Sequence, residues 1–457
     1  MKIIWKSLTG SKKLYQYAAS ISGMMIGLSV GLNYSWTSPY VPFLLSENST
    51  IPINNEQSLW VATIYLIGGV CGSTISGLAL DVIGRRTILM ISLAPFFIGW
   101  MLIVFATNLA GLLVARSLVG FADGITYGST QVYLSEILDK DVRGVVCSFI
   151  TISFLIGILL INVIGTYMTM QDSAIVGIAI VIIALLSLVW TPESPHYLLL
   201  KDRKEDARRS LIILRRVHDV DDELQLIDET VQSERSGNFL DLFRSKVQRN
   251  SLLIVLGLRA TQMFSGVLVF IIYIQMLFES STETISPLVS TVILYSIQII
   301  VSLVSSNIVD KIGRRPLMIV STAIVSVSLF GLGTYFYLRD YNYINKTSLE
   351  WFPLFGLVVS SIAFSIGLQM IPLFIVGELF ASNVKAKGTA ISDIACFIFA
   401  YLASEYFQRT AAYGLFVPMY TFGCCTSIGL IMTIWKLPET RNKTLQEIQG
   451  ELKKNQK

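Results

Sequence analysis

The sequence has little charge, few cysteines and almost no histidine. Only 14% of its 457 residues are charged, whereas roughly a quarter are charged in soluble domains. Two histidines are too few for a histidine-rich metal site. The five cysteines lie in or beside apolar runs without C-x-x-C spacing, a pattern of small buried residues that excludes a disulfide framework or zinc site (Cys71, Cys147, Cys396, Cys424, Cys425).

Long apolar segments are what the sequence has instead. A helix needs about 20 mainly apolar residues to cross a bilayer, because lipid cannot satisfy a bare peptide group. The first segment is too long for the apolar core of a secretion signal. We predict an all-α membrane protein of twelve transmembrane helices in two six-helix bundles, with spans at about 15–34, 58–80, 87–107, 109–131, 146–167, 173–191, 250–278, 286–309, 316–337, 351–377, 388–408 and 412–435.

The distribution of lysine and arginine predicts the orientation. Thirty of the 35 basic residues lie in the N-terminus, the loops after even-numbered spans and the C-terminal tail. The opposite loops carry only Arg339, Lys346 and Arg409. Because basic residues accumulate on the cytoplasmic side, both termini are expected in the cytoplasm. Glycosylation sequons at Asn48 and Asn345 then fall in extracellular loops, whereas the one at Asn442 falls in the cytoplasmic tail.

A local repeat indicates that the two halves are duplicates. Residues 81–86 read DVIGRR after span 2, and residues 310–315 read DKIGRR after span 8. Gly84 and Gly313 suit a tight turn that needs positive φ. We therefore expect an N-terminal bundle at 1–192, a cytoplasmic linker at 193–249, a C-terminal bundle at 250–436 and a cytoplasmic tail at 437–457.

The linker is dense in charge. Residues 201–249 hold eleven acidic and eleven basic side chains. Apolar residues recur at helical spacing on two faces, which predicts short amphipathic helices beneath the bundles (Ala207, Leu211 and Leu214; Leu224, Ile227 and Val231). A charge-dense linker is usually a solvated surface, so we assign it no chemistry beyond tethering.

Further motifs resemble the sugar porter family of the major facilitator superfamily. Residues 192–199 (PESPHYLL) and 438–445 (PETRNKTL) look like its signatures after the last span of each half. Residues 133–136 (YLSE) with Arg143, and 374–380 (FIVGELF), match its loops after spans 4 and 10. Residues 35–39 (SWTSP) look most like insect facilitated trehalose transporters. The resemblance covers nearly the whole chain and implies transport of a sugar by alternating access of two bundles around a midplane site.

Charged motif residues recur at equivalent places in the two halves. Glu136 and Glu378 end spans 4 and 10, within reach of the arginines of the two GRR turns. We hypothesise a cytoplasmic charge network that holds the inner gate shut and stabilises the outward-open state. The alternative is anchoring at the lipid headgroups. The network comprises Asp81, Arg85, Arg86, Glu136, Arg143, Glu193, Asp310, Arg314, Arg315, Glu378, Lys387 and Glu439.

Two arginines lie inside spans, where a cation usually faces a partner or water. Arg116 in span 4 is expected to be structural, paired with an acid or a carbonyl across the bundle. Arg259 lies near the cytoplasmic start of span 7, and we expect it to extend its charge to the membrane surface.

The predicted substrate site departs from the family pattern. The usual Gln-Gln-x-Ser-Gly stretch of span 7 reads QMFSG at 262–266, and Cys396-Phe397 replaces the common asparagine and tryptophan of span 11. Each remaining polar group is about as often a hydrogen-bond partner between helices as a ligand contact. The candidate lining is Gln262, Gln298, Thr151, Gln369 and Asn33, with Tyr273 and Phe397 as apolar walls or gate.

Several functions stay open on these residues. The substrate is trehalose, a hexose or a less polar solute, and a non-transporting sugar sensor is a further alternative. Span 1 has no acid where proton-coupled relatives place an aspartate, so passive transport is favoured. Neither an enzyme's nucleophile and base nor a metal-ligand pattern is visible, and we expect no cofactor, nucleic acid or obligatory protein partner. The cell membrane is the default location.

Overall fold

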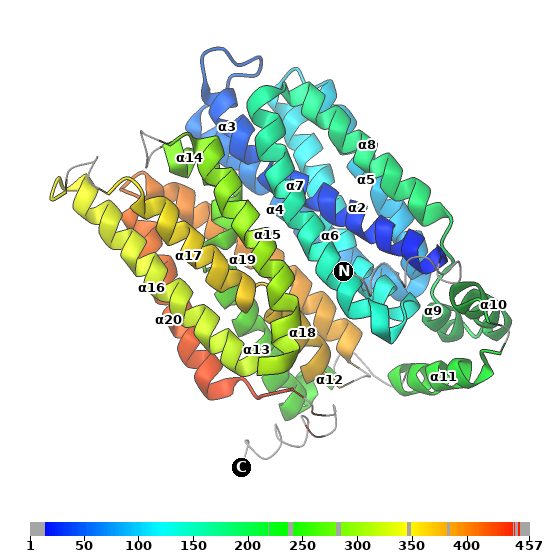
Figure 1. Cartoon of the computed structure of the whole chain (residues 1–457). Helices are drawn as coiled ribbons and strands as arrows, with labels where there is room; N and C mark the ends of the chain where they lie inside the picture. Colours follow the sequence, from blue (N-terminus) through cyan, green and yellow to red (C-terminus); the bar gives the residue numbers. More distant parts are fainter. Residues whose placement is uncertain are drawn as a thin grey trace.

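Two bundles of α-helices lie side by side in the computed structural model (Figure 1). The structure describes residues 14–217, 219–235, 241–279, 285–344, 349–381, 384–441, 443 and 447. The first bundle contains α2 (Leu14–Ser35), α3 (Thr37–Leu45), α4 (Asn55–Ile83), α5 (Arg85–Val104), α6 (Leu109–Ile137), α7 (Lys140–Tyr167) and α8 (Met170–Val189). The second contains α13 (Lys246–Met263), α14 (Val267–Glu279), α15 (Pro287–Ile312), α16 (Arg314–Asp340), α17 (Phe352–Ile366), α18 (Ile371–Leu379), α19 (Lys385–Ala411) and α20 (Phe416–Lys436).

Every predicted span overlaps helical structure, and the all-helical membrane fold is confirmed. Within the described residues, eleven segments are long and apolar enough to cross a membrane. Two of these combine consecutive helices, α13 with α14 and α17 with α18. The first predicted span, α2, is 22 residues long but is not among the eleven. Its glycines, serines and Gln16 lower its hydropathy, so the twelfth span and the orientation of the termini stay predictions.

Close backbone approach fixes the core of the first bundle. A Cβ atom at Gly120 of α6 would lie 1.9 Å from the carbonyl oxygen of Tyr65 in α4, and one at Gly72 of α4 would lie 2.0 Å from that of Phe121. Only glycine permits such contact, and small residues are what let helices in a bilayer approach closely. This approach sets Tyr65 beside the middle of α6.

The second bundle contains two broken spans. Span 7 breaks between α13 and α14, where Gly266 has φ +78°. Span 10 breaks at residues 367–370, between α17 and α18. The Gln262 amide donates to the carbonyl oxygens of Leu368 at 2.8 Å and Gln369 at 3.2 Å. Broken helices are tolerated in a membrane where side chains satisfy the freed backbone groups, so Gln262 supports the second break from the first.

Four short helices connect the bundles on the side where α5 begins: α9 (Pro195–Leu200), α10 (Lys204–Arg215), α11 (Asp221–Arg235) and α12 (Asp241–Arg244) (Figure 1). Arg208 donates to Asp221 at 2.8 Å, and this hydrogen bond holds the pKa of the carboxyl below its usual value. Most of the apolar residues predicted for the linker pack into a small core of their own, which includes Ala207, Leu211, Leu224 and Val231, with Ile227 packed against it. Leu214 packs into the main core instead.

The two GRR turns have the predicted backbone conformation. Gly84 has φ +111° and ψ 155°, and Gly313 has φ +110° and ψ 160°. This region is essentially restricted to glycine. Each glycine ends one long helix and begins the next, and a glutamate covers the turn. A Cβ atom at Gly84 would lie 2.6 Å from Glu193 Oε2, and one at Gly313 would lie 2.8 Å from Glu439 Oε2.

We predict that Gly84→Ala destabilises the protein by about 1–3 kcal/mol, because alanine must adopt a strained conformation and displace Glu193. Thermal unfolding of detergent-purified protein, followed by fluorescence-detected size exclusion, measures the loss. The control is Gly144→Ala in α7, where an added Cβ meets nothing within 4 Å and alanine favours the helix. Equal unfolding temperatures for both variants would contradict the prediction.

Candidate functional site

The charge network of the first half, on the predicted cytoplasmic side, joins spans 3 and 4 to the linker. Arg85 is 5% exposed and forms ion pairs with Glu136 at 3.1 Å and Asp81 at 3.0 Å. Ser194 at the start of α9 donates to Glu136 as well. Glu193 accepts from the backbone N–H of Arg86 at 2.9 Å. This carboxylate therefore caps the N-terminus of α5, where the helix dipole favours a negative charge.

The second half repeats this arrangement. Arg314 pairs with Glu378 at 3.3 Å, as Arg85 pairs with Glu136. Glu439 accepts from the backbone N–H groups of Arg314 and Arg315, both at 3.1 Å, and so caps α16. Arg315 donates to the carbonyl oxygen of Ile434 at 2.7 Å, as Arg86 does to that of Val189 in the first half. The internal symmetry of the sequence thus extends to hydrogen bonds.

These ion pairs each lie within one half. The ion pairs tie the arginine of each GRR turn to the end of span 4 or span 10, and the hydrogen bonds of Glu193, Glu439, Arg86 and Arg315 tie the turn to the end of the last span of its own bundle. The side chains of Arg143 and Asp310 lie outside the described residues. Lys387 takes part in an interaction of its own. The gating role of the network stays a prediction.

Hydrogen bonds between the halves gather at the opposite, predicted extracellular ends. Ser35 and Thr37, at the junction of α2 and α3, donate to the carbonyl oxygens of Ile271 and Ile272 in α14 at 3.0 and 3.2 Å. The Gln408 amide of α19 donates to Ser58 of α4 at 3.0 Å. The structure therefore holds the halves together at this end.

The predicted lining residues of the second half are buried near the broken spans. Gln262 is 4% exposed; its amide nitrogen is held by span 10, and its oxygen accepts from Arg259 at 3.1 Å. The Gln369 side chain accepts from Ser302 at 3.2 Å. Gln298 is buried and makes no hydrogen bond in the described part of the chain. Of these three amides, Gln298 is the one left without a protein partner.

The predicted polar residues of the first half have fewer partners. Asn33 is fully buried; its amide nitrogen donates to the Ser29 carbonyl at 2.8 Å, and its side-chain oxygen has no partner among the described residues. Thr151 is partly buried and donates to Cys147 one turn earlier at 3.3 Å. Arg116 donates to the backbone carbonyl of Asn33 at 2.9 Å, which confirms a carbonyl partner across the bundle. Its guanidinium also lies over the rings of Trp36 and Tyr65.

The two predicted apolar walls lie at different levels. Tyr273 stacks on Phe407 with ring centroids 5.5 Å apart and donates to Gln408 at 2.7 Å, so it lies at the end where the halves are hydrogen-bonded to each other. Phe397 lies in the middle of α19. Its ring meets that of Tyr127 in α6 edge-on at 5.9 Å, and a Cβ atom at Gly69 of α4 would overlap it. Phe397 therefore packs across the interface between the halves.

The prediction that Arg259 extends its charge to the membrane surface was wrong. It is 1% exposed and pairs with Asp393 of α19 at 3.2 Å. It also donates to Ser392 at 2.9 Å and to Tyr127 of the first half at 3.3 Å. A buried arginine with a carboxylate and several acceptors is satisfied where it lies, so it has no need to extend to water. The sequence could not reveal the pair, because 134 residues separate its members.

A second buried acid, Asp123 of α6, was also not among the predicted site residues. It is fully buried and accepts from the Tyr65 hydroxyl at 2.5 Å. Tyr65 packs edge-on against Tyr34, which in turn packs against Phe154. These residues come from α2, α4, α6 and α7, and they form the face that the first half turns toward the second.

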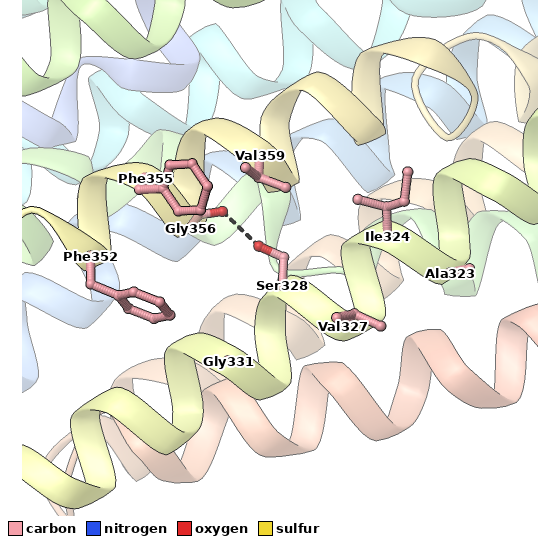
Figure 2. A pocket seen from close by; sticks show the side chains of 9 residues that line it. All are labelled: Ala323, Ile324, Val327, Ser328, Gly331, Phe352, Phe355, Gly356 and Val359. Atoms are coloured by element: carbon pink, nitrogen blue, oxygen red, sulfur yellow. Dashed lines mark hydrogen bonds between the residues drawn. The ribbon is translucent and has the colours of Figure 1, made fainter.

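A pocket of about 410 Å³ lies elsewhere, between α16 and α17 (Figure 2). Its walls are apolar, apart from Ser328, which donates to the Gly356 carbonyl at 2.6 Å. Val327 and Phe355 in this pocket are 72% and 54% exposed on the outer face of the bundle. It contains none of the predicted site residues and faces away from the interface between the halves.

Two membrane-embedded helical bundles, with polar side chains buried between them, define a solute carrier of the major facilitator type. The fold resembles the proton:xylose symporter XylE of this superfamily, in a structure bound to 6-bromo-6-deoxy-D-glucose. Its TM-score is 0.79 at 21% identity, covering 96% of this chain and 99% of that one. The model of the "Sugar (and other) transporter" family matches residues 12–452, and the chain belongs to this family. It is therefore a carrier and not an enzyme.

Relatives are similar along nearly the whole chain. The facilitated trehalose transporter Tret1 of Apis mellifera ligustica is 32% identical over 443 residues, covering 95% of this chain and 87% of the relative. The protein of the same name from Anopheles gambiae is 31% identical over 96% of this chain, which spans only 56% of that relative's length.

We predict that Glu136→Gln lowers the rate of sugar uptake about tenfold or more, with a normal amount of the protein at the cell surface. The substitution leaves Arg85 buried without its main carboxylate, which costs about 3–5 kcal/mol when a buried pair is broken. Uptake per surface-labelled molecule is the measurement.

The control for Glu136→Gln is Asp206→Asn, which removes an ion pair with Arg203 of similar length, 2.8 Å, in which both side chains are exposed. Exposed pairs contribute only about 0–1 kcal/mol, so uptake should stay normal. Normal uptake by Glu136→Gln as well would leave the network without a role in transport.

Proposed function

We propose that the protein is a facilitative sugar carrier that moves trehalose or a hexose across the cell membrane by alternating access. The observation that carries the proposal is membership of the sugar transporter family, with similarity to facilitated trehalose transporters over nearly the whole chain. The buried polar residues between the halves supply partners for hydroxyl groups, which need them in a dry site.

Passive transport is supported by the first span and by one of the two buried acids, Asp393. The other, Asp123, has no basic partner among the described residues, so the ionophore experiment below decides whether it carries a proton. The described part of the first span, residues 14–45, contains no acid. Asp393 is already neutralised by Arg259 at 3.2 Å. A proton-coupled carrier needs a titratable acid that is free to exchange its proton, and this pair is poorly suited to that task.

A carrier of a less polar solute is the second candidate. It is favoured by Gln262, whose amide nitrogen and oxygen both have protein partners. A solute that binds without the Gln262 amide would leave the hydrogen bonds between spans 7 and 10 in place.

We predict saturable uptake of radiolabelled trehalose or glucose into cells expressing the protein, unaffected by a proton ionophore. A passive carrier needs no proton gradient, so the ionophore should change neither rate nor saturation. Cells expressing Glu136→Gln at equal surface level provide the control for endogenous uptake. Ionophore-sensitive uptake would overturn the facilitator, and absence of uptake of both sugars would favour the second candidate.

We predict that the protein carries a glycan at Asn48, which lies exposed between α3 and α4. Under the proposed orientation this loop is extracellular, where glycans are added. Glycosidase treatment should increase gel mobility, and Asn48→Gln should abolish part or all of that shift. Asn442→Gln, in the proposed cytoplasmic tail, is the matched control and should change nothing. A glycan at Asn442 would reverse the orientation.

A further inference from the structure

The two acids buried between the halves differ in their partners. Asp393 is 6% exposed and pairs with Arg259. Asp123 is 0% exposed, and the one hydrogen bond of its carboxylate within the described residues comes from the Tyr65 hydroxyl. Its Oδ1 atom has no partner there. A buried carboxylate oxygen left without a partner is costly, which makes it a candidate to bind a ligand.

The cations nearby are engaged elsewhere. Arg116, two turns before Asp123 on α6, donates to the carbonyl of Asn33 and lies over the Tyr65 ring, 4.8 Å from its centroid. Arg259 is engaged by Asp393, Ser392, Gln262 and Tyr127. No described lysine or arginine forms an ion pair with Asp123.

Asp123 faces the interface between the halves. Tyr65, which donates to Asp123, packs edge-on against Tyr34 at 5.1 Å, and a Cβ atom at Gly69, one turn further along α4, would overlap Phe397 of the second half. Tyr127 lies one turn beyond Asp123 on α6 and contacts both Phe397 and Arg259 across the interface. Tyr127 remains partly exposed despite these contacts, so accessible space reaches this level.

The chemistry of this region suits a polyhydroxyl solute. An ionised carboxylate only accepts hydrogen bonds, and a sugar hydroxyl donates one. Tyr65 fixes the orientation of the carboxylate by holding Oδ2, which leaves Oδ1 for the solute. Gln262, by contrast, is held by Arg259 and span 10.

We propose that Asp123 is a specificity-determining residue that accepts a hydrogen bond from one hydroxyl of the transported sugar through its free Oδ1. The inference rests on the proposed function. A site built around such an acceptor rejects analogues that lack the hydroxyl, because its polar atom is then left unpaired.

Uptake of glucose and of its 2-, 3-, 4- and 6-deoxy analogues by cells expressing the full chain tests the proposal. In the wild type, KM for one deoxy analogue should exceed that for glucose by about 10- to 100-fold, as expected for a hydrogen bond to a charged group. In Asp123→Ala, KM for glucose should rise to that of the analogue, so that the ratio falls to about one. A merely structural role would lower the maximal rate for all sugars and leave the ratio unchanged.

Two further variants keep the test decisive. Asp123→Asn preserves shape and replaces the charged acceptor by a neutral one, so the ratio should fall to an intermediate value even if the alanine variant fails to fold. Asp206→Asn, which removes an acid of the same type from an exposed ion pair in the linker, is the control and should leave the ratio at its wild-type value. For a variant that reaches the membrane without transporting, sugar-induced thermal stabilisation of purified protein gives the same comparison.

The outcomes separate this inference from the proposed function. Saturable wild-type uptake, with the same ratio in both Asp123 variants as in the wild type, overturns the role of Asp123 and leaves the sugar carrier standing. Wild-type protein at the surface that neither transports nor binds glucose or trehalose overturns both.

Discussion

The structure depends on the constraint that no peptide group may remain unpaired in the hydrocarbon layer. Spans 7 and 10 break near the middle of the second bundle, and each break frees backbone groups. The Gln262 amide satisfies two carbonyls of span 10, and the Ser321 hydroxyl accepts from the N–H of Leu368 at 3.1 Å. Arg259 then holds the oxygen of Gln262, and Asp393 balances the charge of Arg259. One chain of partners thus runs from the broken backbone to a buried ion pair, and it determines which polar groups remain free for a solute.

What the sequence could predict is what local chemistry decides. The spans were predictable from the apolar runs, because each run must cross the bilayer by itself. The positive φ of the GRR turns was predictable because it depends on a glycine within the turn itself. The carboxylates that cover those turns, Glu193 and Glu439, were predicted from their repeated positions in the two halves. Both were expected to pair with arginine side chains, whereas the contacts observed within the described residues are mainly with backbone N–H groups. A helix N-terminus attracts an acid through its unpaired N–H groups. Which N–H groups are unpaired is known only once the structure shows where the helix begins.

The candidate site was less predictable because its members meet only through packing. Arg259 was expected to be exposed because it lies near the start of its span. It is buried because its partner, Asp393, lies on another helix that packs against it. Asp123 and Tyr65 face each other because glycines let α4 and α6 approach almost to backbone contact. Gln262 was rightly singled out as a polar group in a span, yet its hydrogen-bonding capacity is largely used by the protein.

The distribution of contacts also bears on how the halves move. The ion pairs of both charge networks lie within one half, so they can persist while the halves rotate. Among the described residues, seven hydrogen bonds cross between the halves at the predicted extracellular end, and four of them go to backbone carbonyls, those of Ile271, Ile272, Asn162 and Asn55. Each such bond contributes only about 0.5–1.5 kcal/mol net, since water can replace it when the end opens. Rigid halves joined by weak contacts can exchange between two arrangements, which is the mechanical requirement for alternating access. The same reasoning sets Tyr127 apart, because its bond to Arg259 crosses the interface in the middle, where a change in the separation of the halves must break it.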